Sequence, residues 1–371
     1  MPDVLLAGAF GQRNPGDEAL LRSFLRALPG GRVVVTSSDP TATVSAHACD
    51  AIPSSRPQVV LRELKRADAL VIGGGTVFKT LHPSCGRGPH ALLRNAMLLA
   101  AAARSLGRPL LMTGVGVGSL ATRQSQRLSR QLVRAADLLV LRDEESAAVL
   151  TGIGAPAPFR VGADPAWTLL DEPPAEPRDR AAVAVVALSH LAGDVNLAST
   201  IVERLRPVVD TGLALWLQPW QHTGDPDLAL EIAAGLDGDV TVLDPPSDLT
   251  DARGAFATAQ LVIGMRFHAL VAAAAAGTPF VAVDHELKLG AIARRFAQPS
   301  VALTEPPARL AAAVADALAG SPPGVSAVRE QVALAEEAFR LMRLVLEGGS
   351  GPGSDELTGL PLEPAPWEVR A

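Results

Sequence analysis

The sequence lacks the features of several large protein classes. It contains no tyrosine, only two cysteines, Cys49 and Cys85, and no dense run of lysine or arginine. Two cysteines without paired spacing are too few for a disulfide framework or a zinc site, so we expect free thiols in a reducing compartment. The formal charge of −6 over 371 residues is mild. Without a basic patch, we expect no nucleic-acid partner.

Long hydrophobic runs are also missing. The longest uncharged apolar stretch, residues 269–283, contains Gly277-Thr278-Pro279 and is shorter than the ~20 residues that span a bilayer. We therefore expect a helix followed by a strand there. The N-terminus, Met1-Pro2-Asp3, has neither the basic region nor the small-residue cleavage site of a signal peptide. These features predict a cytoplasmic protein.

Short β-rich apolar runs alternate with longer amphipathic stretches such as residues 18–28, a pattern typical of parallel sheets covered by helices. The expected strands of the first half are residues 4–9, 32–36, 69–72, 110–114 and 138–141, and those of the second half are 183–188, 214–217, 240–243, 261–263, 280–283 and 301–303. Between the halves, residues 171–180 are charged and rich in proline, as in an interdomain linker.

These patterns predict an α/β protein with two Rossmann-like parallel-sheet domains facing a central cleft. We expect an N-terminal α/β domain over residues 1–170, the linker over 171–180, a C-terminal α/β domain over 181–325, a C-terminal helix over 326–347 and a flexible tail over 348–371. Ligands of such folds bind beyond the carboxyl ends of the strands, so the loops that follow strands are the candidate sites.

Three glycine-rich segments follow strands in the first half. Residues 8–18 lead into a helix, and their glycines would allow backbone N–H groups to approach a ligand. Asp17 as a helix cap and Gly16 as a turn residue explain the same segment equally well. Gly73-Gly74-Gly75 allows either a ligand or another backbone to come close. We interpret residues 114–118 as a third turn, which lacks the spacing of a nucleotide-binding loop.

The strongest candidate lies in the second half, where a strand runs into Gly264-Met265-Arg266-Phe267-His268 and then an alanine-rich helix. Arg266 and His268 would stand near a helix N-terminus, where the dipole and free N–H groups favour an anion. An arginine there costs a few tenths to about one kcal/mol unless something negative is bound. Its position therefore predicts a phosphate or carboxylate ligand. An outward-turned arginine with a capping or core histidine is the alternative.

Taken in order, these motifs resemble the polysaccharide pyruvyl transferase family. The matching motifs are Asn14-Pro15-Gly16-Asp17-Glu18-Ala19, Gly73-Gly74-Gly75, Gly114-Val115-Gly116-Val117-Gly118, Leu141-Arg142-Asp143-Glu144-Glu145-Ser146, Ala163-Asp164-Pro165-Ala166, and the run from Val262 through Gly264-Met265-Arg266-Phe267-His268-Ala269-Leu270 to Gly277-Thr278-Pro279 and Lys288. The resemblance extends over roughly residues 4–296. Its most specific part is the Gly-Met-Arg-x-His-Ala-Leu run with the downstream Gly-Thr-Pro and lysine.

The resemblance implies a two-domain fold like that of GT-B glycosyltransferases. It also implies transfer of a pyruvyl group from phosphoenolpyruvate to a sugar of a cell-wall or extracellular polysaccharide, or of its lipid-linked precursor. The product would be a cyclic ketal, with phosphate released. Neither a metal nor a cofactor beyond the co-substrate is implied. A lipid-linked acceptor would bring peripheral association with a membrane, and nothing in the sequence indicates an oligomeric state.

The resemblance places the donor on Arg266, Phe267, His268 and Lys288. Phosphoenolpyruvate carries a phosphate and a carboxylate, and its methylene carbon must gain a proton. We therefore assign anion binding to Arg266 and the general acid to His268. Where family members usually carry an arginine after the first strand of the second domain, this chain has Ser189-His190-Leu191. One donor contact is then either missing or supplied by His190.

On the acceptor side, Asp17 is the candidate to orient or deprotonate the sugar hydroxyl, which completes a catalytic set of His268, Arg266 and Asp17. The expected acceptor-binding residues are Asn14, Asp17, Gly74, Gly75 and Trp220. Trp220 offers a flat apolar face for a sugar, although it would serve equally well as a core residue. The loop after the triple glycine departs from the family pattern, so the sequence does not fix the sugar.

Two alternatives stay open. The first is a nucleotide-sugar glycosyltransferase of GT-B architecture, because a fold does not fix its donor and the arginine at the helix start suits a diphosphate as well. The second is a non-catalytic sugar- or anion-binding relative, which the change at His190 and the altered glycine loop would explain.

Overall fold

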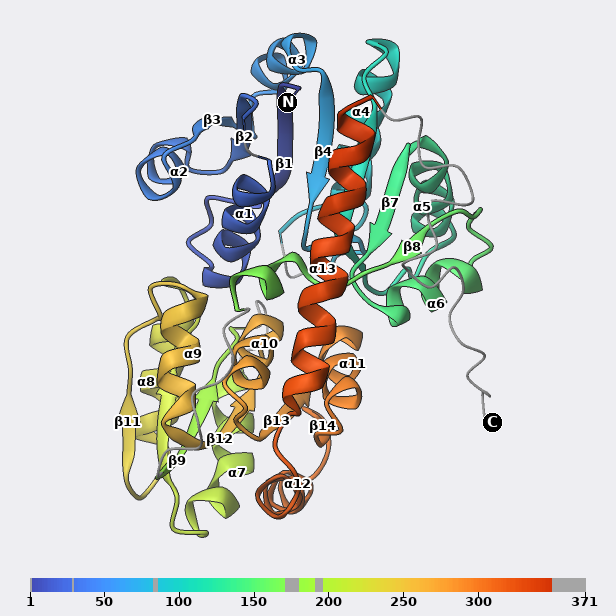
Figure 1. Ribbon diagram of the computed structural model, residues 1–371. Coiled ribbons are helices and arrows are strands. Elements are labelled where there is room, and N and C mark those ends of the chain that lie inside the picture. Colours follow the sequence, from blue (N-terminus) through green and yellow to red (C-terminus); the bar gives the residue numbers. More distant parts are fainter. Residues whose placement is uncertain (1, 29, 83–85, 171–179, 191–195, 349–371) are drawn as a thin grey trace. The chain divides into compact units, whose positions relative to one another are not determined.

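The structure is a computed structural model that describes residues 2–28, 30–82, 86–170, 180–190 and 196–348. The chain divides into two compact units, each formed from separated segments (Figure 1). Unit 1 comprises residues 1–12, 20–168 and 331–371, and unit 2 comprises residues 13–19 and 169–330. The predicted linker, apart from Arg180, and the predicted tail beyond Gly348 lie outside the described residues.

Unit 1 contains an eight-stranded parallel sheet. Its strands follow the order β3-β2-β1-β4-β6-β7-β8, and β5 pairs separately with β6. The strands are β1 (Val4–Phe10), β2 (Val33–Ser37), β3 (Asp50–Pro53), β4 (Ala69–Gly73), β5 (Thr76–Phe78), β6 (Leu110–Val117), β7 (Leu138–Leu141) and β8 (Arg160–Val161). From β1, the chain adds β2 and β3 on one side of the sheet and then β4, β6, β7 and β8 on the other. The strand order therefore reverses between β1 and β4.

The helices of unit 1 follow its strands in alternation. They are α1 (Pro15–Ala27), α2 (Pro40–His47), α3 (Pro57–Arg66), α4 (Ala91–Ser105), α5 (Arg123–Ala135), α6 (Glu144–Gly152), the 3₁₀ helix η2 (Pro165–Leu169) and α13 (Val325–Leu346). The first residues of α1 and of α13 group with unit 2. Phe339 of α13 packs edge-on against Phe24 of α1, with ring centroids 5.0 Å apart. The C-terminal helix is thus part of the unit 1 core.

Unit 2 contains a six-stranded parallel sheet in the order β11-β10-β9-β12-β13-β14. Its strands are β9 (Ala181–Ala187), β10 (Ala214–Gln218), β11 (Val240–Val242), β12 (Ala259–Gly264), β13 (Phe280–Asp284) and β14 (Ser300–Ala302), and its helices are α7 (Leu197–Val209), α8 (Asp225–Ala234), α9 (Leu249–Ala257), α10 (Phe267–Ala275), α11 (Leu287–Arg295) and α12 (Pro307–Ala319). The order reverses between β9 and β12, which is where doubly wound folds bind ligands.

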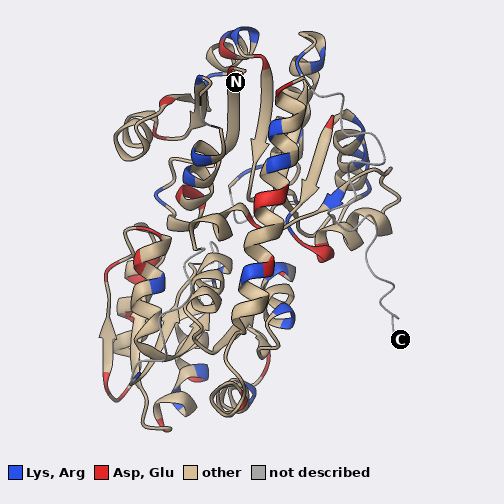
Figure 2. Cartoon of the chain, in the orientation of Figure 1, with Lys and Arg blue, Asp and Glu red and all other residues tan. Residues whose placement is uncertain are grey.

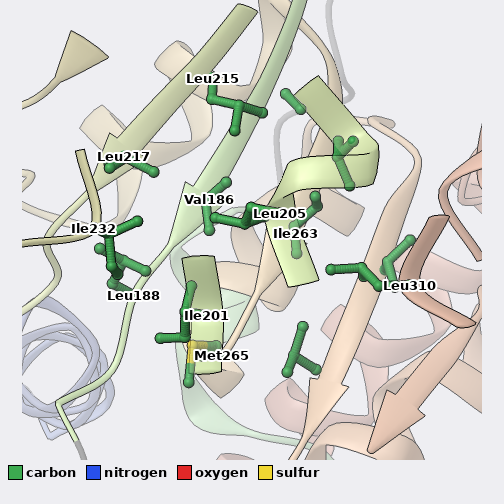
Figure 3. Close-up of a cluster of buried hydrophobic side chains, with 14 of the residues drawn as sticks. Val186, Leu188, Ile201, Leu205, Leu215, Leu217, Ile232, Ile263, Met265 and Leu310 are labelled. Carbon is green, nitrogen blue, oxygen red and sulfur yellow. The ribbon is translucent and has the colours of Figure 1, made fainter. Parts of the chain in front are cut away.

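Burial explains why α10 lies where it does. Every residue of this helix except His268 is buried, and a helix that is apolar all round is stable only inside a core. On the strand side, Met265 belongs to the same apolar cluster as Ile201, Leu205 and Ile263, and Figure 3 shows its side chain among these core residues. Core packing therefore holds the segment before and after Arg266 in place.

The predicted fold class is confirmed, since both units are α/β with parallel sheets. Each predicted strand is present within a few residues, whereas β3, β5 and β8 were not predicted. Figure 2 shows the charged residues mostly on helices and loops, as expected for buried strands. None of the described helices is long and apolar enough to cross a membrane.

The interpretation of residues 114–118 as a turn was wrong, because β6 continues to Val117. Gly114 adopts a positive φ of 65°, which an L side chain rarely adopts, and the pairing of β6 with β7 shifts register at this point. Thr76 of β5 pairs with Gly116, beyond the irregularity. The glycines therefore allow a kinked strand to continue.

Candidate functional site

The candidate site lies at the carboxyl ends of the unit 2 strands. Arg266 follows β12 and occupies the N-cap position of α10 with extended backbone. The backbone N–H of Met265 donates to the carbonyl of Ala187 at the end of β9, at 2.9 Å. The start of α10 is thus tied to the neighbouring strand, at the point where strand order reverses.

The Arg266 guanidinium is held along one edge. Its Nε donates to the carbonyl of Leu188 at 3.2 Å, and its Nη2 lies 2.8 and 3.0 Å from the two carboxylate oxygens of Asp225 and 3.0 Å from Oε1 of Gln221. The side chain is 17% exposed. These hydrogen bonds use Nε and Nη2, and Nη1 donates to none of the residues that the structure describes. The two N–H groups of Nη1 are therefore available to a ligand.

Arg266 does not depend on a bound anion for its charge compensation, because the protein supplies a negative partner itself. Asp225 has no exposed surface and forms an ion pair with Arg266. The outward-turned arginine that was the alternative is also excluded by this contact. Asp225 was not among the predicted site residues. Its place at the first residue of α8, directly before Pro226, is the signal that could have drawn attention to it.

His268 lies in the first turn of α10 and is tightly packed. Its ring is in edge-on contact with Phe267, with centroids 5.3 Å apart. The first turn of α1 also packs against it, since a Cβ added at Gly16 would collide with the imidazole. The segment Arg13–Ala19 belongs to unit 2, although the sequence places it in the N-terminal domain. The fold therefore brings the first predicted loop to the strongest predicted motif.

Asp17 lies in the first turn of α1 and is half-buried. Burial raises the pKa of its carboxyl above the ordinary value of 3.8, while the positive charges of His268, Lys288 and Arg266 act to lower it. Asp17 is not the helix cap that was the alternative interpretation. Oδ1 of Asn14 accepts the backbone N–H of Gly16 at 3.0 Å, so Asn14 caps α1.

Lys288 is the second residue of α11, which follows β13. Its Nζ lies 2.7 Å from Oε2 of Glu286, and both side chains are partly exposed. Beside them, burial lowers the pKa of His285, and the charges of Lys288 and Arg266 lower it further against the opposing effect of Glu286. The cluster of Asp17, Arg266, His268 and Lys288 thus comes from the N-terminal ends of α1, α10 and α11.

His190 follows β9, and its backbone N–H donates to Oδ1 of Asp225 at 2.6 Å. Its ring packs over Gly224, which has a positive φ of 80°. Trp220 is buried with 1% of its surface exposed, so its place in the structure favours the core interpretation over an acceptor-binding face. Gly74 and Gly75 belong to unit 1. A Cβ at Gly74 would press on Leu20, whereas the space around Gly75 is open.

The fold is GT-B-like, as comparison with solved structures shows. S. aureus MnaA, solved with UDP, has a TM-score of 0.65 at 12% identity, with 98% of this chain and 100% of that chain covered. A putative UDP-N-acetylglucosamine 2-epimerase from Listeria monocytogenes has a TM-score of 0.62 at 13% identity, with 94% and 98% covered. Anabaena Alr3699/HepE in complex with UDP-glucose has 0.57 at 13% identity, with 94% and 100% covered.

The chain belongs to the polysaccharide pyruvyl transferase family, whose model matches residues 14–286. The matched range begins at Asn14 and includes Arg266 and His268, so both sides of the cluster described above fall within it. No curated protein matches the chain in sequence. The match to the family model confirms the resemblance inferred from the motifs.

Proposed function

We propose that this chain transfers a pyruvyl group from phosphoenolpyruvate to a sugar of a cell-wall or extracellular polysaccharide, or of its lipid-linked precursor. The reaction would form a cyclic ketal and release phosphate. The observation that carries the proposal is the convergence of Arg266, His268, Lys288 and Asp17 in unit 2. Membership of the pyruvyl transferase family supports the same reaction class.

The donor suits the cationic side of the cluster. Phosphoenolpyruvate presents a phosphate and a carboxylate on a small frame, and Arg266 offers a fixed positive charge and the two N–H groups of Nη1, since its Nε and Nη2 are held by Leu188, Gln221 and Asp225. The N-terminus of α10 adds a favourable dipole, and Lys288 adds a second cation. We assign donor binding to Arg266, Phe267, His268 and Lys288, with His190 in the place of the expected family arginine.

The chemistry requires two proton transfers. The first sugar hydroxyl attacks C2 and loses its proton, while the methylene carbon gains one and becomes a methyl group. The second hydroxyl then displaces phosphate, which leaves with the remaining proton. His268 is assigned as the acid toward the methylene carbon. Asp17 is assigned as the base, because a carboxyl with a raised pKa accepts a proton more readily than an ordinary one.

For the acceptor, we propose contacts from Asn14 and Asp17 of unit 2. Gly74 and Gly75, which belong to unit 1, stay acceptor candidates on the sequence resemblance alone. Of these, Gly75 has the open surroundings that a bound sugar needs. The burial of Trp220 makes it the weakest of the proposed acceptor residues.

The test is an assay of purified protein with phosphoenolpyruvate and a panel of lipid-linked or nitrophenyl sugars. We expect phosphate release that depends on a sugar, and a product whose mass has increased by one pyruvyl ketal. The activity should survive a chelator, since the reaction needs no metal. Transfer from a UDP-sugar instead would favour the nucleotide-sugar alternative, in keeping with the UDP found in fold neighbours. Phosphate release without any sugar would point to hydrolysis.

A further inference from the structure

Asp225 joins the ends of three neighbouring strands in unit 2. Its carboxylate accepts the backbone N–H of His190 after β9, at 2.6 Å, and those of Trp220 and Gln221 after β10, at 3.1 and 2.8 Å. It also accepts the guanidinium of Arg266 after β12. Because β10, β9 and β12 are adjacent in the sheet, one side chain fixes the loops on both sides of the point where strand order reverses.

The carboxylate is buried completely. A buried charge is costly unless hydrogen bonds and an opposite charge compensate it, and here three backbone N–H groups and one guanidinium do so. Removing the charge would therefore release several donors together. Their loops, at residues 188–190 and 218–221, would lose a shared partner.

The same contacts determine how Arg266 faces its surroundings. A guanidinium is planar, so fixing Nε on the Leu188 carbonyl and Nη2 on Asp225 and Gln221 also fixes the direction of Nη1. An arginine without these partners would keep its charge but sample many rotamers, and ordering it would weaken ligand binding.

We propose that Asp225 is a positioning residue for the donor. It sets the plane of Arg266, so that Nη1 meets the phosphate or carboxylate of phosphoenolpyruvate. Asp225 acts through Arg266 and does not touch the substrate. The inference rests on the proposed function for the identity of the donor, whereas the ordering of the loops can be measured without it.

Asp225→Asn keeps the size of the side chain and removes its charge. We expect the KM for phosphoenolpyruvate to rise about tenfold or more, with a smaller change in kcat, because a misplaced binding group costs mainly binding. Hydrogen exchange of the amides of His190, Trp220 and Gln221 should become faster. Asp227→Asn is the matched control, since Asp227 is exposed in the first turn of the same helix. Leu205→Ala, in the unit 2 core, controls for lost stability, with a lower Tm and an unchanged KM.

A double-mutant cycle with Arg266→Ala separates positioning from a general structural effect. If Asp225 acts through Arg266, Asp225→Asn adds nothing to the KM of the Arg266→Ala protein. Additive effects, an unchanged KM or unchanged amide exchange in Asp225→Asn would each overturn the inference. If the wild-type protein neither binds nor turns over phosphoenolpyruvate, the proposed function is contradicted but the positioning role of Asp225 is not. Titration with inorganic phosphate would then decide the inference, which predicts weaker binding to Asp225→Asn than to the wild type.

Discussion

Each unit has an arginine within two residues of a strand's end and beside the start of a helix. Arg142 of unit 1 follows β7 and is 3% exposed; its Nε donates to Asp143 at 3.0 Å, Nη1 lies 3.8 Å from Asp164, and Gly116 packs against the guanidinium. Arg266 of unit 2 is 17% exposed and is held along one edge only. The same sequence signal thus gives an enclosed structural ion pair in one unit and an arginine with an outward edge in the other.

The largest expected difference between the two sites concerns the residue two positions after each arginine. His268→Ala should lower kcat by about 100- to 10,000-fold, the usual contribution of a general acid, with the fold retained. Glu144→Ala, at the corresponding position after Arg142, should leave kcat within about twofold, since Glu144 belongs to unit 1 and not to the proposed donor site. Steady-state phosphate release with circular dichroism of both variants checks this. Normal turnover by His268→Ala would remove the acid assignment.

Arg142 itself should matter for stability rather than for kinetics. Arg142→Met leaves Asp164, which has no exposed surface, without its arginine, and breaking a buried pair costs about 3–5 kcal/mol. Urea unfolding should report that loss, while the KM for phosphoenolpyruvate of the folded protein stays unchanged. A raised KM with normal stability would mean that Arg142 also serves a ligand.

Gly16 and Gly254 offer a matched pair of glycines associated with unit 2. A Cβ at Gly16 collides with His268, whereas a Cβ at Gly254 in α9 meets nothing within 4 Å. Gly16→Ala should therefore displace the imidazole and lower kcat by about 10- to 100-fold. Gly254→Ala should leave kcat unchanged and stabilise the helix by about 0.5–1 kcal/mol. Equal kcat in the two variants would show that His268 tolerates the displacement.

The smallest expected effect is on the pH dependence of stability. Because burial raises the pKa of Asp17, the folded protein keeps this proton to higher pH than the unfolded chain does. The resulting stabilisation is complete below the ordinary value of 3.8 and is lost as pH rises through the folded pKa. Asp17→Asn cannot ionise, so its stability should fall less over that window. Thermal melts from pH 3 upward compare the two proteins, and parallel curves would contradict the assignment.

Most strands could be predicted from the sequence. That residues 13–19 belong to unit 2 and residues 331–348 to unit 1 could not. Apolar periodicity predicted the long strands, while β5 and β8 have only three and two residues and therefore almost no periodic signal. The first turn of α1 lies against His268 because of a packing contact that no local pattern encodes. Asp225 was missed for a similar reason, since its partners come from three separate loops and are brought together only by the sheet.

Arg266 shows the same limit of local sequence patterns. The prediction that this arginine lies at the start of a helix is confirmed. From that position we inferred an anionic ligand as the negative partner. The buried carboxylate of Asp225 comes from the start of α8, which is distant in the sequence, so it could not be foreseen from the neighbours of Arg266. Arg266 therefore differs from Arg142 in its Nη1 group, which the contacts to Leu188, Gln221 and Asp225 do not use.

The most direct test of this distinction is a calorimetric titration of phosphoenolpyruvate into the wild type, Arg266→Lys and Arg142→Lys. Lysine keeps the charge but loses the planar fork. We expect Arg266→Lys to raise the Kd about tenfold or more, equivalent to about 1.4 kcal/mol for each factor of ten, and Arg142→Lys to bind as the wild type does. Wild-type affinity in Arg266→Lys, or the same loss in both variants, would contradict the assignment of the donor site to unit 2.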